Sequence, residues 1–542
     1  MQTLLYESIR KNMKQTLLVL LMTIVSASMY AAVEIDGLYY NLLKKAGTAE
    51  VAKPPRQYSG HIVIPESVVY EGVTYRVISI GESAFSNSKT LQSVKIPNSV
   101  TKIDNLAFSE CRNIKEIPLP DSLKYLGNHV FYHCVELETV TFPTTIEYVG
   151  RGIFEQCVGL KTLYINDLVA WCNIPWSTAG SGNPMSYAQK TYINGEELKD
   201  LVIPGGVTAI GYAAFAGCKM TSLTLPSTVT SIDDQAFSYC PQLTSLTIPN
   251  TVKSIGSCAF QGCTKLASVT LPNSIDHVSN GMFSLCSSLE SISIPDAMTS
   301  IGNGAFSNCT GLKSISLPRA LKNIGTNAFR GCTALEDITL PEGLTSIGSD
   351  AFRESGLKSL SLSSTIDSIP PYCFYECAGL QSLDLKNVKS IARNAFYGCT
   401  GLTSINIPDN VTTIDLGAFQ GCNNVRTLTI GRNVRTIKSV AFASMTELTD
   451  VYCRAEPVPE TIDDAFWNSY IEYATLHVPA SAEEAYKAAV PWNGFGKVAT
   501  GIDGVRTSAS TGPLYDLQGR RLNTKPSKGV YILSGKKIWE SQ

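Results

Sequence analysis

Cysteine is the residue type with the most chemistry to offer in this chain, which contains sixteen of them. Twelve share one position, three residues after a recurring phenylalanine: Cys111, Cys134, Cys157, Cys218, Cys240, Cys263, Cys286, Cys309, Cys332, Cys377, Cys399 and Cys422. If each interval is one coil of a stack, neighbouring Cα atoms would lie ~5 Å apart, which disulfides allow in an oxidising compartment. Ser88, Ser355 and Met445 occupy the same position. We therefore predict buried thiols that pack as small core residues, and the redox state stays open.

Metal binding is not indicated by the spacing of any of these side chains. The sequence has no C-x-x-C pair, and Cys373 and Cys377 are not at a zinc spacing. Of the five histidines, only His129 and His133 are close together, and they lack the acidic residue and the helix of the H-E-x-x-H motif. We predict no metal site and no cofactor.

Catalytic motifs are likewise missing from the sequence. There is no G-x-S-x-G nucleophile elbow. The stretch from Gly529 to Lys536 imitates a phosphate loop, but it has one residue too many and Lys537 where Ser or Thr belongs. A glycosidase would need two converging carboxylates, and a sequence does not show convergence. We predict no catalytic residues and no enzyme, with a carbohydrate-active enzyme as a minor alternative.

Charge and composition narrow the class of protein further. Lys and Arg number 44 against 46 Asp and Glu, without a long basic run, which argues against a nucleic-acid partner. Hydrophobic residues make up 44% and charged residues 17% of the chain, enough to build a core. The protein is expected to be folded.

Residues 1–31 have the layout of a secretory signal peptide. Arg10, Lys11 and Lys14 precede an apolar run over residues 17–25, and small residues follow it. The run is well short of the ~20 residues that span a bilayer, and no later run reaches that length. We predict an exported protein, at the cell surface or extracellular, without a transmembrane segment.

The elements that must position all of these residues come from one repeat. Ala-Phe or a near variant ends each repeat, with a step of 22 to 24 residues apart from one gap of 61, at Phe85, Phe108, Phe131, Phe154, Phe215, Phe237, Phe260, Phe283, Phe306, Phe329, Phe352, Phe374, Phe396, Phe419, Phe442 and Phe466. In the repeat from Cys309 to Phe329, Ile315 and Leu317 alternate with serine, which predicts a short strand that Pro318 ends. A second apolar pair returns the chain, so each coil buries its apolar residues against its neighbours.

The consensus C-x-x-L-x-S-(V/I/L)-x-(I/L)-P-x-x-(V/L)-x-x-I-G-x-x-A-F closely resembles the BspA-like, treponemal-type leucine-rich repeat over residues 81–466. The resemblance implies a right-handed parallel β-solenoid with one strand per coil on its concave side and a spine of stacked phenylalanines. Residues 32–80 resemble an N-terminal β cap, and 467–498, with a helical stretch over 482–489, a C-terminal capping repeat. Residues 499–542 read as a linker and a small β segment that resembles the sorting segment of secreted Bacteroidota proteins.

Two regions are candidates for binding. The outward positions of the predicted strands carry mostly Ser and Thr, which either keep the surface soluble or line a groove for an extended protein partner. The 61-residue gap holds an insertion at about 166–200 with Trp171, Trp176, Tyr187 and Tyr192, which we take as candidate ligand-binding residues. The alternative is that Trp171 belongs to a variant repeat and packs in the core.

These observations predict a non-enzymatic, exported adhesin-like protein that binds through an extended solenoid surface. The resemblance implies host matrix proteins, cell-surface proteins or glycans as partners. Many equivalent weak contacts along the array could then add up to a useful affinity. The alternative is a structural envelope component that has no saturable ligand.

Overall fold

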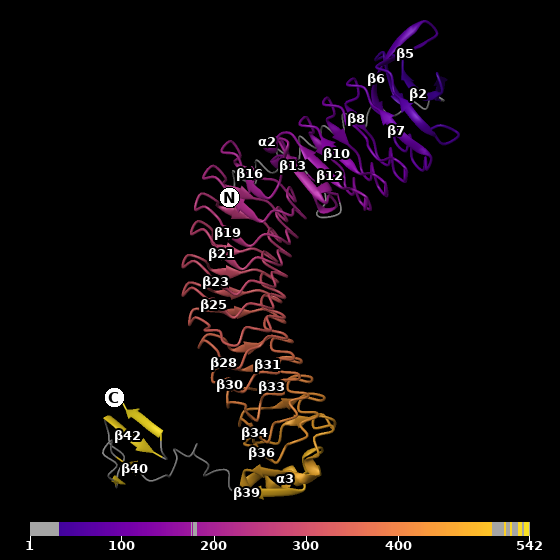
Figure 1. The fold of residues 1–542 in the computed structure, drawn as a ribbon. Coiled ribbons are helices and arrows are strands. Elements are labelled where there is room, and N and C mark those ends of the chain that lie inside the picture. Colours follow the sequence, from indigo (N-terminus) through magenta and orange to yellow (C-terminus); the bar gives the residue numbers. More distant parts are fainter. Residues whose placement is uncertain are drawn as a thin grey trace. The chain divides into compact units, whose positions relative to one another are not determined.

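This computed structural model describes residues 32–174, 176 and 182–500, together with four strands between residues 514 and 540 (Figure 1). The predicted signal peptide, residues 1–31, lies outside the described residues. The chain divides into two compact units, the first made of the residues up to 366 with 370–380, the second of residues 367–369 with those from 381 onward. None of the described helices has the length and apolar content needed to cross a membrane.

The described chain begins with antiparallel strands that give way to parallel ones. β1 pairs with β2, β2 with β3, and β5 with β6, all antiparallel, whereas β3 pairs with β6 in parallel, and so does β6 with β8. β6 therefore pairs with β5 in an antiparallel hairpin and with β8 in the parallel ladder that continues into the solenoid. The strands are β1 (Val33–Ile35), β2 (Leu38–Leu43), β3 (Thr48–Val51), β4 (Gly60–Val63), β5 (Ser67–Tyr70) and β6 (Val73–Ile80).

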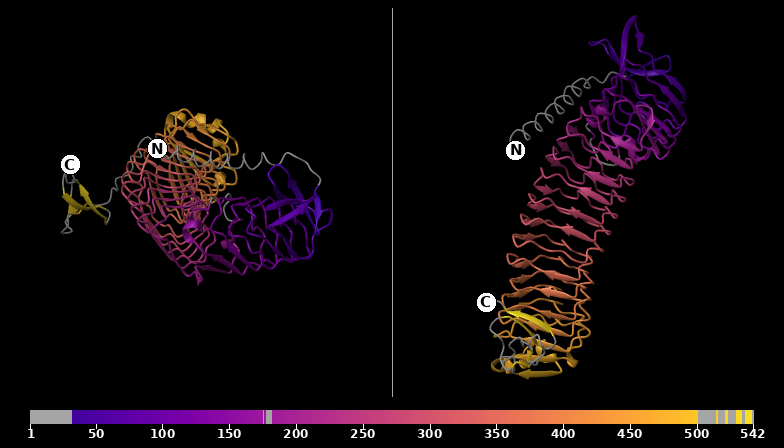
Figure 2. Two further views of the ribbon diagram at one scale, coloured as in Figure 1. Left: turned by 90° about the horizontal axis from the view of Figure 1, so that it is seen from above. Right: turned by 60° about the vertical axis from the view of Figure 1, so that its left-hand side comes forward.

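Most of the coils that follow contribute one strand to a row that we call the long-strand row (Figures 1 and 2). In strands such as β23 and β25 the central apolar residue is buried, and a proline lies two residues after the strand, as the sequence predicted. In the first unit these strands are β7 (Leu91–Lys95), β10 (Thr139–Phe142), β12 (Thr162–Ile165), β13 (Lys190–Ile193), β15 (Asp200–Val202), β17 (Ser222–Thr224), β19 (Ser245–Thr247), β21 (Ser268–Thr270), β23 (Ser291–Ser293), β25 (Ser314–Ser316) and β28 (Ser359–Ser361). In the second unit they are β30 (Ser382–Asp384), β32 (Ser404–Asn406), β34 (Thr427–Ile430), β36 (Asp450–Cys453), β38 (Thr475–Val478) and β39 (Lys497–Thr500).

A second row of two-residue strands, the short-strand row, runs along the same coils and pairs in parallel. The parallel β-solenoid is therefore confirmed, but the expectation of one strand per coil was incomplete, because the returning apolar pair also forms a ladder. The first unit contains β8 (Lys102–Ile103), β9 (Tyr125–Leu126), β11 (Tyr148–Val149), β16 (Ala209–Ile210), β18 (Ser231–Ile232), β20 (Ser254–Ile255), β22 (His277–Val278), β24 (Ser300–Ile301), β26 (Asn323–Ile324) and β27 (Ser346–Ile347). The second contains β29 (Ser368–Ile369), β31 (Ser390–Ile391), β33 (Thr413–Ile414), β35 (Thr436–Ile437) and β37 (Glu460–Thr461).

A third ladder of hydrogen bonds follows the turn around each repeat phenylalanine. The backbone N–H of Phe108 donates to the carbonyl oxygen of Val130 in the next coil over 2.9 Å, and Leu106 and Glu110 donate in the same sense. The latter two residues have positive φ angles of 58° and 62°. Left-handed residues two positions before and after the phenylalanine recur along the array, which explains why Asn and Gly are frequent there.

The core is a stack of phenylalanine rings with a column of thiols beside it. The rings of Phe237 and Phe260 are fully buried and lie parallel, with centroids 5.5 Å apart. Most of the twelve column thiols donate to the carbonyl oxygen of the phenylalanine one coil earlier, as Cys134 Sγ does to Phe108 over 3.2 Å. The prediction of buried thiols is confirmed, and all sixteen cysteines are free thiols. Ser469, in the same position, makes the equivalent bond to Phe442 over 2.7 Å.

Glycine before the repeat Ala-Phe allows the coils to approach one another. A Cβ atom at Gly256 would lie 2.3 Å from the backbone nitrogen of Asp234, and one at Gly348 would lie 2.4 Å from that of Thr326. Contacts this short do not occur between real atoms, so the glycine of the I-G-x-x-A-F consensus sets the spacing between coils.

The end of the second unit contains the predicted helix, α3 (Glu483–Ala488), between the 3-10 turns η3 (Ile471–Tyr473), η4 (Ala480–Ala482) and η5 (Trp492–Gly494). After residue 513 the chain forms an antiparallel sheet in the order β41-β40-β42-β43. Its strands are β40 (Leu514–Tyr515), β41 (Arg521–Leu522), β42 (Gly529–Leu533) and β43 (Lys536–Glu540). The strands predicted there are confirmed, whereas a sorting role for this segment stays a prediction.

Candidate functional site

In many strands of the long-strand row, the residues before and after the central apolar residue are exposed Ser or Thr. In β23, Ser291 and Ser293 are exposed on either side of the buried Ile292. They align with Ser314 and Ser316 of β25, and β19 and β21 repeat the arrangement. Of the predicted outward positions, Ser222 is half-buried and eleven are exposed: Thr224, Ser245, Thr247, Ser268, Thr270, Ser291, Ser293, Ser314, Ser316, Ser359 and Ser361. We call these twelve positions the hydroxyl surface.

The described residues of the insertion, 166–174, 176 and 182–200, pack as part of the solenoid. Asp167 caps the helix α2 (Leu168–Cys172) by accepting a hydrogen bond from the N–H of Ala170 over 2.9 Å. Asn183 caps the 3-10 turn η2 (Pro184–Ser186) and, fully buried, donates to the carbonyl oxygens of Ala213 and Ala214. The chain then enters β13 and turns back into β14 (Glu196–Glu197), a hairpin that the sequence analysis missed although Asn-Gly, at residues 194–195, is a known turn signal.

Trp171 and Trp176 lie in the core, with exposed fractions of 1% and 4%. Both rings contact Phe142, and Trp171 Nε1 donates to the carbonyl oxygen of Ala214 over 2.8 Å. The packing alternative for Trp171 is confirmed. A ligand-binding role does not fit either indole, because a ligand at the surface would not reach a ring enclosed by the core.

The two predicted tyrosines of the insertion are both half-buried, but they occupy different settings. Tyr187 ends the turn η2, and burial raises the pKa of its hydroxyl. Tyr192 lies in β13, where its ring stacks on that of Tyr164 in β12 with centroids 5.2 Å apart. Beside it, Lys190 and Glu197 form an ion pair of 3.1 Å. Of the four predicted ligand-binding residues, Tyr192 alone therefore belongs to a strand of the long-strand row.

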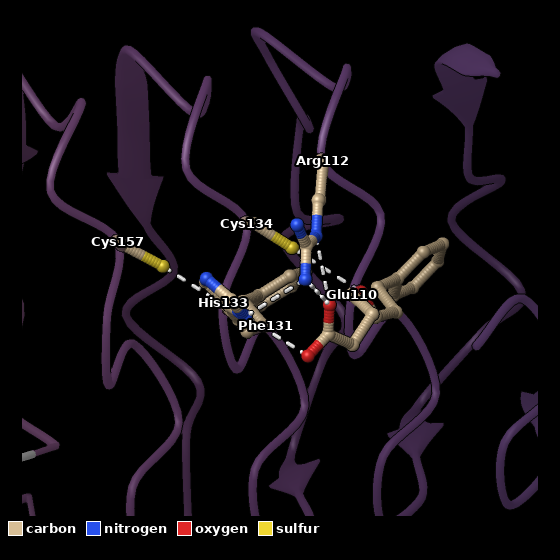
Figure 3. A network of polar contacts seen from close by, with 7 residues as sticks. Glu110, Arg112, Phe131, His133, Cys134 and Cys157 are labelled. Atoms are coloured by element: carbon tan, nitrogen blue, oxygen red, sulfur yellow. Dashed lines mark hydrogen bonds and ion pairs between the residues drawn. The ribbon is translucent and has the colours of Figure 1, made fainter. Parts of the chain in front are cut away.

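His133 takes part in a polar network that links two coils (Figure 3). Its Nδ1 lies 2.9 Å from Glu110 Oε1, and the guanidinium of Arg112 lies 2.7 Å from Glu110 Oε2. The hydrogen bonds from His133 and Arg112 lower the pKa of the Glu110 carboxyl. Local spacing gave no sign of this acidic partner, because Glu110 is 23 residues earlier, one coil away.

One arrangement resembles a Ser-His-Asp triad and consists of Asp276, His277 and Ser279. His277 Nδ1 lies 2.7 Å from Asp276 Oδ1, and its Nε2 lies 3.4 Å from the hydroxyl oxygen of Ser279. However, Ser279 is buried and donates its proton to the carbonyl oxygen of Ile255. With its proton directed away from the histidine, the hydroxyl is not activated as a nucleophile.

The thiols are also poorly suited to chemistry. Burial raises the pKa of Cys157, Cys309 and Cys422 to about 12, so the reactive thiolate is scarce at neutral pH. Over the part of the chain that the structure describes, no three His, Cys, Asp or Glu side chains are grouped to hold a metal ion. The hydroxyl surface is therefore the candidate site, because its polar side chains are exposed and recur at a regular spacing.

Comparison with known proteins assigns the chain to a family. A family model described as the BspA type leucine rich repeat region, in six copies, matches residues 70–172, 186–313, 299–391 and 368–489. Similar solved structures include a leucine-rich repeat protein from Bacteroides ovatus, with 24% identity, covering 86% of this chain and 99% of that chain at a TM-score of 0.46. A leucine rich cell surface protein from Faecalibacterium prausnitzii has 25% identity, covering 74% and 95% at a TM-score of 0.41. A leucine-rich repeat protein from Eubacterium ventriosum has 22% identity, covering 62% and 98% at 0.41. No curated protein matches this chain.

Proposed function

Because this chain belongs to the BspA-type leucine-rich repeat family, we propose that it is an exported, non-enzymatic cell-surface protein that binds other proteins along its long-strand row. Its partners are host matrix or cell-surface proteins, and glycans are the second ligand class to be tested. Binding is distributed over many coils rather than concentrated in one pocket.

The observation that carries this proposal is the constant register of the hydroxyl surface. Ser245 and Thr247 of β19 align with Ser268 and Thr270 of β21, so hydroxyls recur at the strand spacing of ~4.8 Å. A hydroxyl both donates and accepts hydrogen bonds, so it can pair with the N–H or the C=O of a partner's backbone. Individually weak contacts of this kind can add along the array when one partner engages several coils at once.

The side chains that could act in catalysis support a binding role over an enzymatic one. The Ser279 proton is directed to a backbone carbonyl oxygen, and the thiols are buried with raised pKa values. The His133 network fastens one coil to the next through Glu110. These arrangements stabilise the fold, and none of them presents an activated group to a substrate.

The test is saturable binding of the mature chain, residues 32–542, to a panel of matrix proteins and glycans. Ser245→Arg/Ser291→Arg places two bulky charges on the hydroxyl surface, on alternate coils. Ser254→Arg/Ser346→Arg makes the same change at exposed positions of the short-strand row and is the matched control. We expect the first variant to weaken binding and the control to bind like the parent.

Equal binding by the two variants would move the site away from the long-strand row. An absence of saturable binding to every member of the panel would instead favour a structural envelope component. Tyr192→Ser tests the ligand-binding candidate of the insertion that lies in the long-strand row, because a half-buried ring can be removed without opening the core that contains Trp171 and Trp176.

A further inference from the structure

Three exposed aromatic side chains lie within one short stretch of the chain, residues 467–473, near the end of the solenoid. Trp467, Tyr470 and Tyr473 are 61%, 49% and 84% exposed, and we call them the cap aromatic surface. Among the residues whose burial is described, Tyr239 is the one other exposed Phe, Tyr or Trp. Grouped exposed apolar side chains of this size mark contact sites, because leaving them in water is unfavourable.

The backbone beneath the cap aromatic surface is fixed by hydrogen bonds. The carbonyl oxygen of Trp467 accepts the N–H of Ser444 over 2.8 Å, and the N–H of Tyr473 donates to Tyr470 over 3.0 Å. Gly496 donates to the carbonyl oxygen of Ile471 over 3.1 Å and fastens η3 to the chain that enters β39. The aromatic residues are therefore presented by an ordered surface.

The segment that carries this surface is acidic. Glu460, Asp463 and Glu472 are exposed, and no Lys or Arg occurs between Arg454 and Lys487. A partner for this surface should therefore combine apolar residues with positive charge.

The C-terminal sheet, β40 to β43, has that composition. Residues 501–542 contain seven Lys and Arg against three Asp and Glu, whereas residues 32–500 contain 34 against 42. The register pairs Val530 with Trp539 and Ile532 with Lys537, which places these four positions on one face of the sheet. Tyr531, Leu533, Ile538 and Lys536 occupy the opposite face in the same way. In these two strands the first face thus carries three apolar positions and one lysine, and the second carries three apolar positions with Lys536 and Glu540.

A small sheet with two apolar faces needs another layer on at least one of them, because a sheet buries a face only against a second element. The linker at residues 501–513 begins directly after β39, in the same unit as the cap aromatic surface. Its thirteen residues can span up to about 45 Å when extended. The sheet can therefore reach this surface within its own chain.

We propose that the C-terminal sheet packs one of its two apolar faces on the cap aromatic surface of the same chain, with its basic residues facing Glu460, Asp463 and Glu472. The docked sheet covers the end of the solenoid and forms its outermost layer. This inference does not depend on the proposed binding function.

The test is zero-length carbodiimide cross-linking of the full mature chain, which joins a carboxylate directly to a lysine. Mixing equal amounts of ¹⁵N-labelled and unlabelled protein separates links within one chain from links between chains. We expect links within one chain that join Lys525, Lys528, Lys536 or Lys537 to carboxylates between residues 456 and 472. Trp467→Ser/Tyr473→Ser should lose most of this yield, and Tyr239→Ser, an exposed tyrosine in the first unit, should keep it.

A second variant, Arg520→Glu/Arg521→Glu, reverses charge in the sheet segment but retains the four lysines, and it should also lose most of the yield. Unchanged melting of each variant shows that a loss is not due to unfolding. The proposal is overturned if these links are absent, if they persist in Trp467→Ser/Tyr473→Ser, or if they join different chains only. The last outcome would mean that the surface receives the sheet of a second copy.

Discussion

The thiol of Cys157 donates a hydrogen bond to the carbonyl oxygen of Phe131, one coil earlier, over 3.1 Å (Figure 3). The same carbonyl oxygen accepts the N–H of Cys134 over 3.2 Å, so the thiol supplies its second partner. The column of cysteines therefore combines two roles, a small apolar body that packs in the core and a weak donor that links consecutive coils.

Replacing Cys157 by serine should destabilise the protein less than replacing it by alanine. The hydroxyl can keep the bond to Phe131, as Ser469 does to Phe442, whereas alanine removes the donor and leaves a small void. We expect alanine to cost about 1–2 kcal/mol. Urea midpoints of the two variants measure the difference, and a serine variant less stable than the alanine variant would contradict the role of the bond.

The thiols should be unreactive in the native protein and fully available after unfolding. Because burial raises the pKa of Cys157 and Cys309 to about 12, alkylation at pH 8 should be slow, with the half-buried Cys258 reacting first. Unfolding without reductant should release sixteen reactive thiols per chain. Mass spectrometry counts the labels, and a lower number would reveal disulfides.

Truncating one ring of the phenylalanine stack should be among the most damaging single changes. Phe260 lies between Phe237 and Phe283, fully buried, and Phe260→Ala removes both stacking contacts. The expected loss of stability is about 3–5 kcal/mol. Val202→Ala, at a side chain that is 60% exposed, should change the urea midpoint little. Similar midpoints for the two variants would show that the stack does not hold the coils together.

Glu110 should contribute stability that disappears in acid. His133 and Arg112 lower the pKa of its carboxyl below the ordinary value of 4.5, so the ionised form favours the folded state. This contribution is complete above pH 4.5 and is lost as the pH falls through the lowered pKa. Glu110→Gln should therefore be less stable than the parent at pH 6 and equal to it at low pH. The exposed Glu82→Gln is the control, and a pH-independent difference for Glu110→Gln would refute the prediction.

The repeat made most of the fold predictable, because the positions of Pro318, Phe329 and the other consensus residues are dictated by the coil that they build. What the sequence did not reveal are relations between coils. Glu110 and His133 are 23 residues apart, and their contact depends on the coil spacing. The burial of Trp176 escaped prediction for a similar reason: the core that receives it is built in part by Phe142, from an earlier coil.

Backbone N–H groups donate toward the next coil in one part of the solenoid and toward the previous coil in another. In the turn around the phenylalanines, each coil donates to the next, as Phe108 does to Val130, whereas beside the short strands a later coil donates to an earlier one, as Gly256 does to Ile232. Because donors in the two rows point in opposite directions, the peptide dipoles do not all align along the stack, unlike those of an α-helix, which accumulate along its axis. Duplicating coils therefore lengthens such a solenoid without the one-directional alignment of peptide dipoles that grows with the length of an α-helix.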